Sequence, residues 1–419
     1  MSVRLRHLVA VNPATPEFDR LPSNAEVPFL PLECIWPGEL LDTTRRKSRG
    51  EAVAGYTRFR EGDILLPKIT PTFQADRTVI AVGLEGGVGV GTTELHVVRV
   101  GPVADTRYIR YLMSSRPFLE LGEASMFGVA GQKRVPDDHV RNFPVPITDI
   151  DRQRIIADYL DRETGRIDAL IAAKTQMIEA LRERSREART LLVLGASYRG
   201  ARDSGPRWLG DLPAHWQVQR LKYIARMDSG HTPDRKVPEY WMDCEIPWVT
   251  LNDVGALHAS WEIREPANAI NELGMAHSAA HVLPAGSVIL SRDATVGRAA
   301  ILGKPMAVSQ HFVSWTCTGA LLPEYLLNVF RGPMQAHLRT LTAGATIATI
   351  GMPELRELVV PVPLIAEQNE IVREIRNLER VHDQTTSRLI DQASLLHERR
   401  QALITAAVTG ELEIPEVAA

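Results

Sequence analysis

The chain repeats one pattern twice along its 419 residues. RLRHLVAV at 4–11 matches RLKYIARM at 220–227, and REGDILLPK at 60–68 matches PAGSVILSR at 284–292. Further matches, in the same order, join residues 135–147 to 352–364, 150–160 to 365–375 and 181–184 to 396–399. Because the order is kept and every offset lies between 215 and 224 residues, we infer a tandem duplication of a unit of about 215 residues, which is far too long for a solenoid repeat.

Each copy changes character part-way. Its first part, of about 150 residues, contains short apolar runs between turns rich in Gly and Pro, such as DILLPKI and LHVVRV, and these runs predict strands. A Pro-x-Pro sequence then leads into a long segment that is nearly free of Gly and Pro, at 151–194 and again at 366–407. Both segments are predicted to be helices.

Apolar residues recur at steps of three and four along both predicted helices, which favours a coiled coil. The net charges of the two regions are opposite, +3 for 151–207 and −4 for 366–419, and this favours pairing of one helix with the other over self-pairing. The alternative is that each helix packs on its own domain. The predicted interface positions are Ile156, Leu160, Ile167, Leu170, Leu181, Ile371, Ile375, Leu378, Leu389 and Leu396.

We therefore predict an α+β protein in which two mixed α/β domains are separated by a long antiparallel two-helix coiled coil, with a pseudo-twofold internal repeat. At about 1.5 Å per residue, about 40 residues per helix give a rod of roughly 60 Å. The predicted division is 1–150 for the first domain, 151–207 for the first helical region, 208–365 for the second domain, and 366–419 for the second helical region with the C-terminal tail.

The composition, with 44% hydrophobic and 24% charged residues, is typical of an ordinary globular protein. No apolar run reaches the length of about 18 residues that a transmembrane helix needs, and Asn12 and Pro13 interrupt the start of the chain before a signal-peptide core is complete. The cysteines, Cys34, Cys244 and Cys317, are too widely spaced for a disulfide framework or a Cys-x-x-Cys metal site. We expect a protein of the reducing cytoplasm.

The motifs that usually accompany catalysis are missing. The sequence contains no G-x-x-x-x-G-K-[ST] phosphate loop, and Asn12-Pro13 is not followed by the second proline and aromatic residue of amino-methyltransferases. His277 and His281 have helical spacing but lack a glutamate or a third ligand. The run from Ser291 to Asp293 has no obvious histidine partner in the sequence. We therefore predict a binding protein and not an enzyme.

Polar residues gather in equivalent loops of both copies, after the strands at 61–66 and 285–290 and just before each Pro-x-Pro. Arg, Lys, Gln, Asn, Ser and Thr carry the donors and acceptors that read base edges, although each one alone is more often a solvated turn residue. Because the two copies carry different polar sets, we expect two domains that read two targets. The candidate DNA-binding residues are Lys68, Thr70, Gln74, Gln132, Lys133, Arg134, Thr250, Asn252, Ser291, Arg292, Thr295, Gln310 and Thr346.

The sequence resembles the specificity (DNA-recognition) subunits of type I restriction-modification systems over essentially the whole chain. The likeness is carried by SGHTPDRKVPEYWMDCEIPWVTLNDV at 229–254, LPAGSVILSRDATVG at 283–297, VPVPLIAEQNEIV at 360–372 and RRQALITAAVTGELEI at 399–414. GDILLPK, GVAGQKRV and FPVPITDIDRQRII look like the versions of these motifs in the first copy. The first copy departs from the pattern because it lacks an obvious counterpart of Thr-Pro…Tyr-Trp.

The resemblance implies two target-recognition domains, each reading one part of a split site in double-stranded DNA, joined by helical regions that set the spacing. It also implies a subunit that is not itself catalytic and that docks two adenine-methyltransferase modification subunits and, with them, restriction subunits that are translocases and nucleases. No cofactor is then expected in this chain, since S-adenosylmethionine, ATP and Mg belong to the partner subunits.

Two other functions are compatible with the sequence: a coiled-coil interaction scaffold without base-specific reading, and a part of a DNA methylase or nuclease. The net charge of −3 bears on DNA binding, because residues 1–150 have a net charge of zero and residues 208–365 one of −2. Near-neutral domains predict weak DNA binding with a shallow salt dependence, and a basic partner that supplies most of the phosphate contacts.

Overall fold

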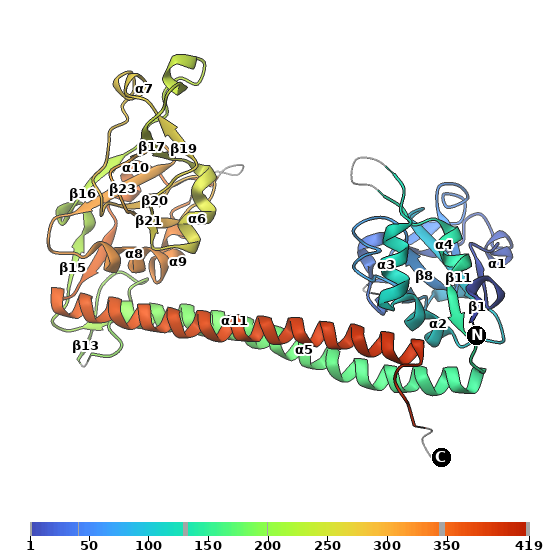
Figure 1. Ribbon diagram of the computed structural model, residues 1–419. Coiled ribbons are helices and arrows are strands. Elements are labelled where there is room, and N and C mark those ends of the chain that lie inside the picture. Colours follow the sequence, from blue (N-terminus) through green and yellow to red (C-terminus); the bar gives the residue numbers. More distant parts are fainter. Residues whose placement is uncertain (1, 41, 129–132, 199, 343–347, 416–419) are drawn as a thin grey trace. The chain divides into compact units, whose positions relative to one another are not determined.

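The computed structural model describes residues 2–40, 42–128, 133–198, 200–342 and 348–415 (Figure 1). The chain forms two compact units. Residues 1–176 and 389–419 make the first unit, and residues 177–388 make the second. Each unit therefore contains one mixed α/β domain together with parts of both long helices.

The strands described in the first unit form mainly two sheets, with the orders β2-β11-β8-β9 and β6-β3-β10-β7. The first sheet consists of β2 (Val9–Val11), β8 (Ile64–Pro67), β9 (Val79–Ile80) and β11 (Leu95–Val100), and the second of β3 (Glu26–Leu30), β6 (Arg46–Ser48), β7 (Thr57–Arg60) and β10 (Val88–Gly91). Two small pairs join β1 (Ser2–Arg4) to β12 (Pro144–Pro146) and β4 (Ile35–Trp36) to β5 (Glu39–Leu40). The helices are α1 (Pro16–Asp19), α2 (Thr106–Met113), α3 (Arg116–Ala124) and α4 (Asp137–Asn142).

The second unit repeats this topology. Its larger sheet has the order β16-β23-β20-β21-β18 and its smaller sheet β19-β17-β22. The strands are β15 (Gln217–Arg220), β16 (Ala225–Ser229), β17 (Ile246–Val249), β18 (Glu262–Ile263), β19 (Asn268–Ile270), β20 (Val288–Ser291), β21 (Ala299–Leu302), β22 (Ala307–Val308), β23 (Phe312–Cys317) and β24 (Val359–Val362), with a separate pair of β13 (Ala201–Asp203) and β14 (Asp211–Pro213). The helices are α6 (Val254–Ala259), α7 (Glu272–Ala276), α8 (Pro323–Arg331), α9 (Met334–Thr340) and α10 (Met352–Arg356).

The match extends to strand direction. The order β2-β11-β8-β9 corresponds to β16-β23-β20-β21, and all of these neighbours are antiparallel. The smaller sheets share a parallel pair, β3 with β10 and β17 with β22. After the sheets, α2, α3 and α4 are followed by β12, as α8, α9 and α10 are followed by β24. The duplication expected from the sequence is therefore present in the fold.

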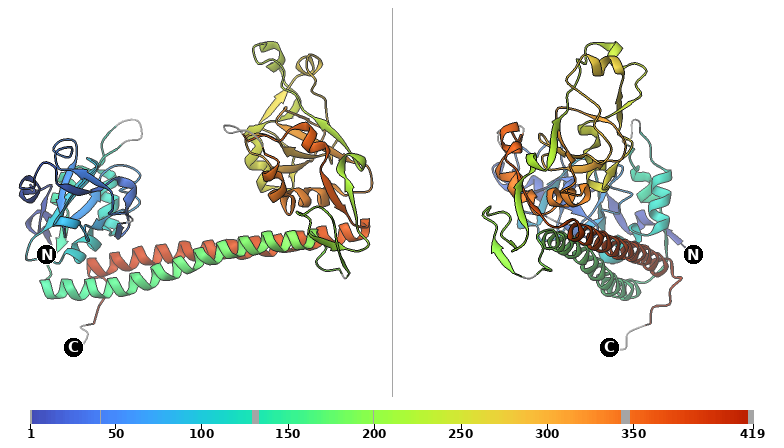
Figure 2. Two further views of the ribbon diagram at one scale, coloured as in Figure 1. Left: turned by 180° about the vertical axis from the view of Figure 1, so that it is seen from behind. Right: turned by 90° about the vertical axis from the view of Figure 1, so that its left-hand side faces the viewer.

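Two long helices, α5 (Ile150–Val193) and α11 (Ile365–Thr409), follow the two domains. In the first unit Asp168 bonds Arg400 and Lys174 bonds Gln392. In the second unit Arg189 pairs with Glu379. The partner's number falls as the α5 number rises, so the helices pair in antiparallel order, and Figure 2 shows them side by side in both views. The α+β fold class with a paired antiparallel helical region is confirmed.

Most of the interface positions predicted for these helices are buried or half-buried in the structure. Ile156, Leu160, Ile167, Ile371, Ile375 and Leu389 are buried, and Leu181, Leu378 and Leu396 are half-buried. Leu170 differs from the others, because 52% of it is exposed. The buried stripe of α5 passes instead through Thr164 and Ile178. Thr164 is tolerated there because its hydroxyl donates to the Leu160 carbonyl, 2.6 Å away.

Each domain packs on the beginning of its own long helix and on the end of the other one. Tyr108 donates to the Val408 carbonyl at 3.4 Å in the first unit. Tyr325 donates to the Val193 carbonyl at 3.0 Å in the second. Both carbonyls lie in the last turn of a helix, where backbone acceptors lack intrahelical donors. The helices therefore pack on the domains as well as on each other, and the two packing modes weighed from the sequence coexist.

A buried glutamine fastens each domain to its helix. Gln368 is fully buried, accepts from the Leu322 N–H at 2.8 Å and donates to the Ala320 and Pro363 carbonyls at 2.9 Å. Gln153, the residue aligned with it, accepts from the Asp105 N–H and donates to the Thr148 carbonyl, both at 2.9 Å. Paired in this way, the buried amides are stable and hold α5 and α11 in the same relation to α2 and α8.

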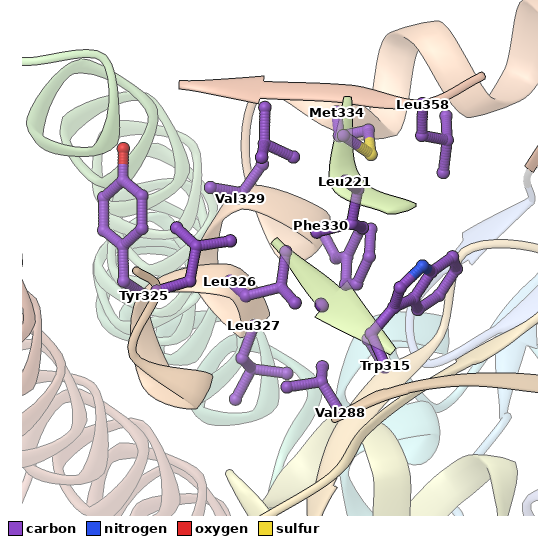
Figure 3. Close-up of a cluster of buried hydrophobic side chains, with 14 of the residues drawn as sticks. Leu221, Val288, Trp315, Tyr325, Leu326, Leu327, Val329, Phe330, Met334 and Leu358 are labelled. Atoms are coloured by element: carbon purple, nitrogen blue, oxygen red, sulfur yellow. The ribbon is translucent and has the colours of Figure 1, made fainter. Parts of the chain in front are cut away.

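The core of the second unit surrounds β20, β23 and α8 (Figure 3). Trp315, Tyr325 and Phe330 are among its fully buried side chains, and the Trp315 and Phe330 ring centroids lie 5.0 Å apart. Gly195, just beyond α5, has a φ of +76°, and a Cβ there would lie 2.6 Å from the Trp216 ring. Only glycine suits both the left-handed backbone and the close approach. This packing fixes the strands whose ends carry the polar loops.

Candidate nucleic-acid interface

Three chain segments meet at the end of β20 in the second unit. The Arg292 N–H donates to the His311 carbonyl at 2.9 Å, and the Ile350 N–H donates to the Arg292 carbonyl at 2.8 Å. The Ala294 N–H donates to the Ala348 carbonyl at 3.0 Å. The loop after β20, the residue before β23 and the segment before α10 are thereby joined through their backbones. We call this arrangement the second junction.

The first unit contains the same junction at the end of β8. The Lys68 N–H donates to the Glu94 carbonyl at 2.9 Å, and the Val135 N–H donates to the Lys68 carbonyl at 2.8 Å. The Thr70 N–H donates to the Lys133 carbonyl at 3.0 Å. These three bonds correspond one for one to those of the second unit, and we call this arrangement the first junction. The predicted loops therefore converge in both copies.

Several of the predicted DNA-binding side chains stand at the first junction. Lys133 and Gln74 are exposed, and the Gln74 amide donates to Glu123. The Thr70 hydroxyl accepts from the Lys133 N–H at 3.3 Å. Lys68 is half-buried and lines a cavity of about 320 Å³ whose wall includes Asn12, Tyr56, Thr57 and Arg58. Gln132, and Thr346 of the second copy, lie outside the described residues.

Arg134 is held by an ion pair. Its Nε and Nη2 atoms donate to the two carboxylate oxygens of Glu94 at 2.8 and 2.7 Å. These hydrogen bonds keep the pKa of the Glu94 carboxyl below its usual value and raise the pKa of Arg134. The pair uses two of the five guanidinium donors, which leaves the other three for an acceptor outside the protein.

Two predicted contact residues of the second unit point inward. Ser291 is fully buried, and its hydroxyl donates to the Thr295 carbonyl and accepts from the Arg298 N–H at 2.9 Å. Thr250 is 7% exposed, and its hydroxyl accepts from the Asn252 N–H at 3.3 Å. Burial keeps both hydroxyls from a base edge. We therefore reassign Ser291 and Thr250 to shaping the loops that carry Arg292 and Asn252.

The remaining candidates of the second unit face outward to different degrees. Asn252, Thr295 and Gln310 are exposed, and Gln310 accepts from the Thr232 hydroxyl. Arg292 is half-buried, and its Nε atom is buried without a hydrogen-bond partner in the described part of the chain. An unpaired buried guanidinium nitrogen is unfavourable, and because Nε is buried, only the rest of the guanidinium is placed to donate to a bound acceptor.

Asp293 has the histidine partner that the sequence did not suggest. Its carboxylate lies 2.6 Å from Nδ1 of His311. Ser291 is not part of this pair, because its hydroxyl is bonded to Thr295 and Arg298. The two side chains form a hydrogen-bonded pair within the second junction, without the arrangement of a catalytic triad.

Comparison with known proteins agrees with this geometry. Residues 213–394 match the family model of the type I restriction modification DNA specificity domain. The specificity subunit of the type I restriction enzyme EcoEI from Escherichia coli is 34% identical over 208 residues, which are 49% of this chain and 34% of that protein. Residues 213–394, in the second copy, are thus similar to the specificity domain of type I restriction-modification systems, and the curated relatives of the chain are specificity subunits of such systems.

Two solved structures show the same fold. One, from a study of complex assembly and conformational transition of the type I R-M system, superposes with a TM-score of 0.76 at 17% identity, covering 98% of both chains. The HsdS subunit from Thermoanaerobacter tengcongensis gives a TM-score of 0.57 at 17% identity, covering 98% of this chain and 97% of that one. The chain spans about a third of the length of the Escherichia coli relative, whereas these structures are matched over nearly their full length.

Three residues of the two junctions, Glu94, His311 and Phe127, were not among the residues predicted from the sequence. Glu94 and His311 went unnoticed because their partners are distant in the sequence, 40 residues away for Arg134 and 18 for Asp293. Phe127 is 64% exposed, and its backbone bonds that of Arg134 in both directions, at 3.2 and 2.9 Å. An aromatic residue just before the sequence GVAGQKR was the available signal, since exposed aromatic rings near basic side chains are common in nucleic-acid sites.

No group of His, Cys, Asp and Glu in the described ranges could hold a metal ion. His277 instead stacks on Tyr240 with 5.5 Å between ring centroids, and Nε2 of His281 lies 3.3 Å from Asp228. Within the part of the chain that the structure covers, every helix is too short or too polar to cross a membrane.

Proposed function

We propose that this chain reads a bipartite site in double-stranded DNA, with one half read at each junction. The observation that carries the proposal is the repetition of one backbone junction with different polar side chains, Lys68, Lys133 and Arg134 in one copy and Arg292, Thr295 and Gln310 in the other. A conserved scaffold with different donors and acceptors suits the reading of two different base sequences.

In this proposal residues 1–150 and 208–365 are the two target-recognition domains, and 151–207 and 366–419 are the helical regions that set the spacing. Thr70, Gln74 and Asn252 act beside the readers, and Gln132 and Thr346 belong to the same loops. Arg292 is the strongest single candidate. Its side chain is half-buried at the second junction, and a guanine offers two acceptors to a bidentate arginine.

The proposed chain is not an enzyme by itself. It docks two adenine-methyltransferase modification subunits and, with them, restriction subunits, and those chains supply S-adenosylmethionine, ATP and Mg in the cytoplasm. The helices support docking, because Leu170, Ile390 and Leu395 of the first unit are 52%, 51% and 61% exposed, and exposed large apolar side chains often mark protein interfaces. Methylation of DNA by the purified chain without a partner would contradict this assignment.

The test begins with selection of bound sequences from random duplexes, followed by Arg292→Ala. Loss of a bidentate contact weakens binding to the selected duplex by about 1–3 kcal/mol and leaves binding to a scrambled duplex unchanged. Arg207→Ala, at an exposed site away from the loops, is the matched control and is expected to bind both duplexes normally. Equal losses on both duplexes would make Arg292 a phosphate contact, and no change would refute the loop assignment.

A further inference from the structure

One position is used alike in both junctions. Glu94 comes directly before β11, and His311 comes directly before the equivalent strand β23. The carbonyl oxygen of each accepts a hydrogen bond from the N–H of the first residue of the polar loop. The Glu94 carbonyl accepts from Lys68 and the His311 carbonyl from Arg292, both at 2.9 Å. The residue before this strand is thus part of the backbone frame that carries the candidate readers.

The side chain of that residue makes a second connection in each copy. Glu94 holds Arg134, on the segment before α4, through two hydrogen bonds of 2.7 and 2.8 Å. His311 holds Asp293, on the loop after β20, at 2.6 Å. The ion-paired side chains are 23% and 38% exposed in the first junction and 30% and 17% exposed in the second. Different side chains at one position therefore tie the strand to a neighbouring segment of its junction in each copy, although the segment is not the same one.

Such a pair restrains the candidate base-reading arginine beside it. The pair at Glu94 orients Arg134 itself, while the pair at His311 fixes Asp293, the residue that follows Arg292. Base reading demands a placement within about 0.5 Å, and a partly buried pair is held more firmly than a surface pair, whose side chains remain mobile. A backbone frame alone leaves the long arginine side chains free to rotate.

We propose that Glu94 and His311 are positioning residues, each of which determines the base discrimination of its own half-site without touching DNA. Glu94 acts through Arg134, and His311 acts through Asp293 and the loop that presents Arg292. The inference rests on the proposed function, because it concerns how the two junctions discriminate between bases.

The experiment measures, for the full chain, the affinity for duplexes that carry single base changes in either half of the selected site. Glu94→Ala is expected to reduce discrimination about 5- to 50-fold in one half-site and to leave the other unchanged, since one well-placed bidentate contact carries about that much. His311→Leu is expected to have the same effect on the opposite half-site. Glu120→Ala and His281→Leu, both at exposed positions, are the matched controls.

Conservative variants separate positioning from folding. Glu94→Gln keeps the shape and one acceptor, and His311→Gln keeps a donor for Asp293, so each restores part of the discrimination while urea midpoints stay near that of the parent chain. Unchanged discrimination in folded Glu94→Ala and His311→Leu variants, or an equal loss in both half-sites, would overturn the inference and leave the proposed function standing. A parent chain that selects no sequence would overturn the proposed function as well.

Discussion

Asp76 is a carboxyl group buried in the first unit, where it accepts from the Ser114 hydroxyl at 2.8 Å. Burial raises its pKa to about 6, although the nearby positive charge of Arg110 opposes the shift. The folded chain therefore holds this proton more tightly than the unfolded chain, whose Asp76 has the ordinary value near 4. The stabilisation is fully present below about pH 4 and is lost as the pH rises through 6.

The prediction is that this group makes the first unit about 3 kcal/mol more stable at pH 4 than at pH 7, with the opposite sign to an ordinary ion-paired carboxylate. Asp76→Asn removes the titration. The difference in unfolding free energy between the parent chain and this variant, measured by urea unfolding between pH 4 and 7, isolates the contribution of Asp76 from the other carboxylates. A difference that is independent of pH would contradict the prediction.

Buried polar side chains mark the limit of what the sequence could predict at the scale of single residues. The polar loops were found because Lys, Arg and Gln stand out beside strand patterns. Ser291 looked equally polar but is buried, since its hydroxyl completes two hydrogen bonds within its own loop. The pairing of Asp293 with His311 depends on which strands are neighbours in the sheet, and this information is not local in the sequence.

At the scale of elements, two apolar residues that are close in sequence on α5 differ in burial, because only one of them lies in the buried stripe of the helix. Ile167 is 7% exposed, whereas Leu170, three residues later, is 52% exposed. We expect Ile167→Ala to lower the free energy of unfolding by about 2–4 kcal/mol, because it leaves a cavity between packed helices. Leu170→Ala is expected to change it by no more than about 0.5 kcal/mol. Urea unfolding of the two variants makes the comparison, and similar losses would show that the stripe is assigned wrongly.

The exposure of Leu170 shows what a pattern of apolar residues leaves out. A heptad pattern counted from apolar residues alone selects Leu170 and passes over Thr164. Thr164 is nevertheless buried, and its hydroxyl tolerates burial because it donates to the Leu160 carbonyl. The order of elements was far easier to predict. Both copies keep the same pattern of buried residues, so strands and helices that recur in the sequence also recur in the fold. The aligned Gln153 and Gln368 likewise both accept from a backbone N–H at the start of a domain helix.

At the scale of the whole molecule, charge decides how the chain meets DNA. The sequence holds 48 Lys and Arg against 51 Asp and Glu, a net charge of −3, and Arg134 is already paired with Glu94. The chain therefore offers DNA no excess of positive charge, which weakens the release of counterions from phosphates. For the chain without partners we predict a slope of log K against log salt shallower than about −3, which corresponds to roughly three phosphate contacts.

The measurement is a salt titration of binding to the selected duplex and to a scrambled duplex of equal length. Base contacts do not release counterions, so the ratio of the two affinities is expected to stay nearly constant while both affinities fall. Adding a basic methyltransferase partner then steepens the slope for both duplexes and leaves their ratio in place. A slope of about −6 or steeper for the chain alone would show that it holds the phosphates itself, and the partner would no longer be needed to explain tight binding.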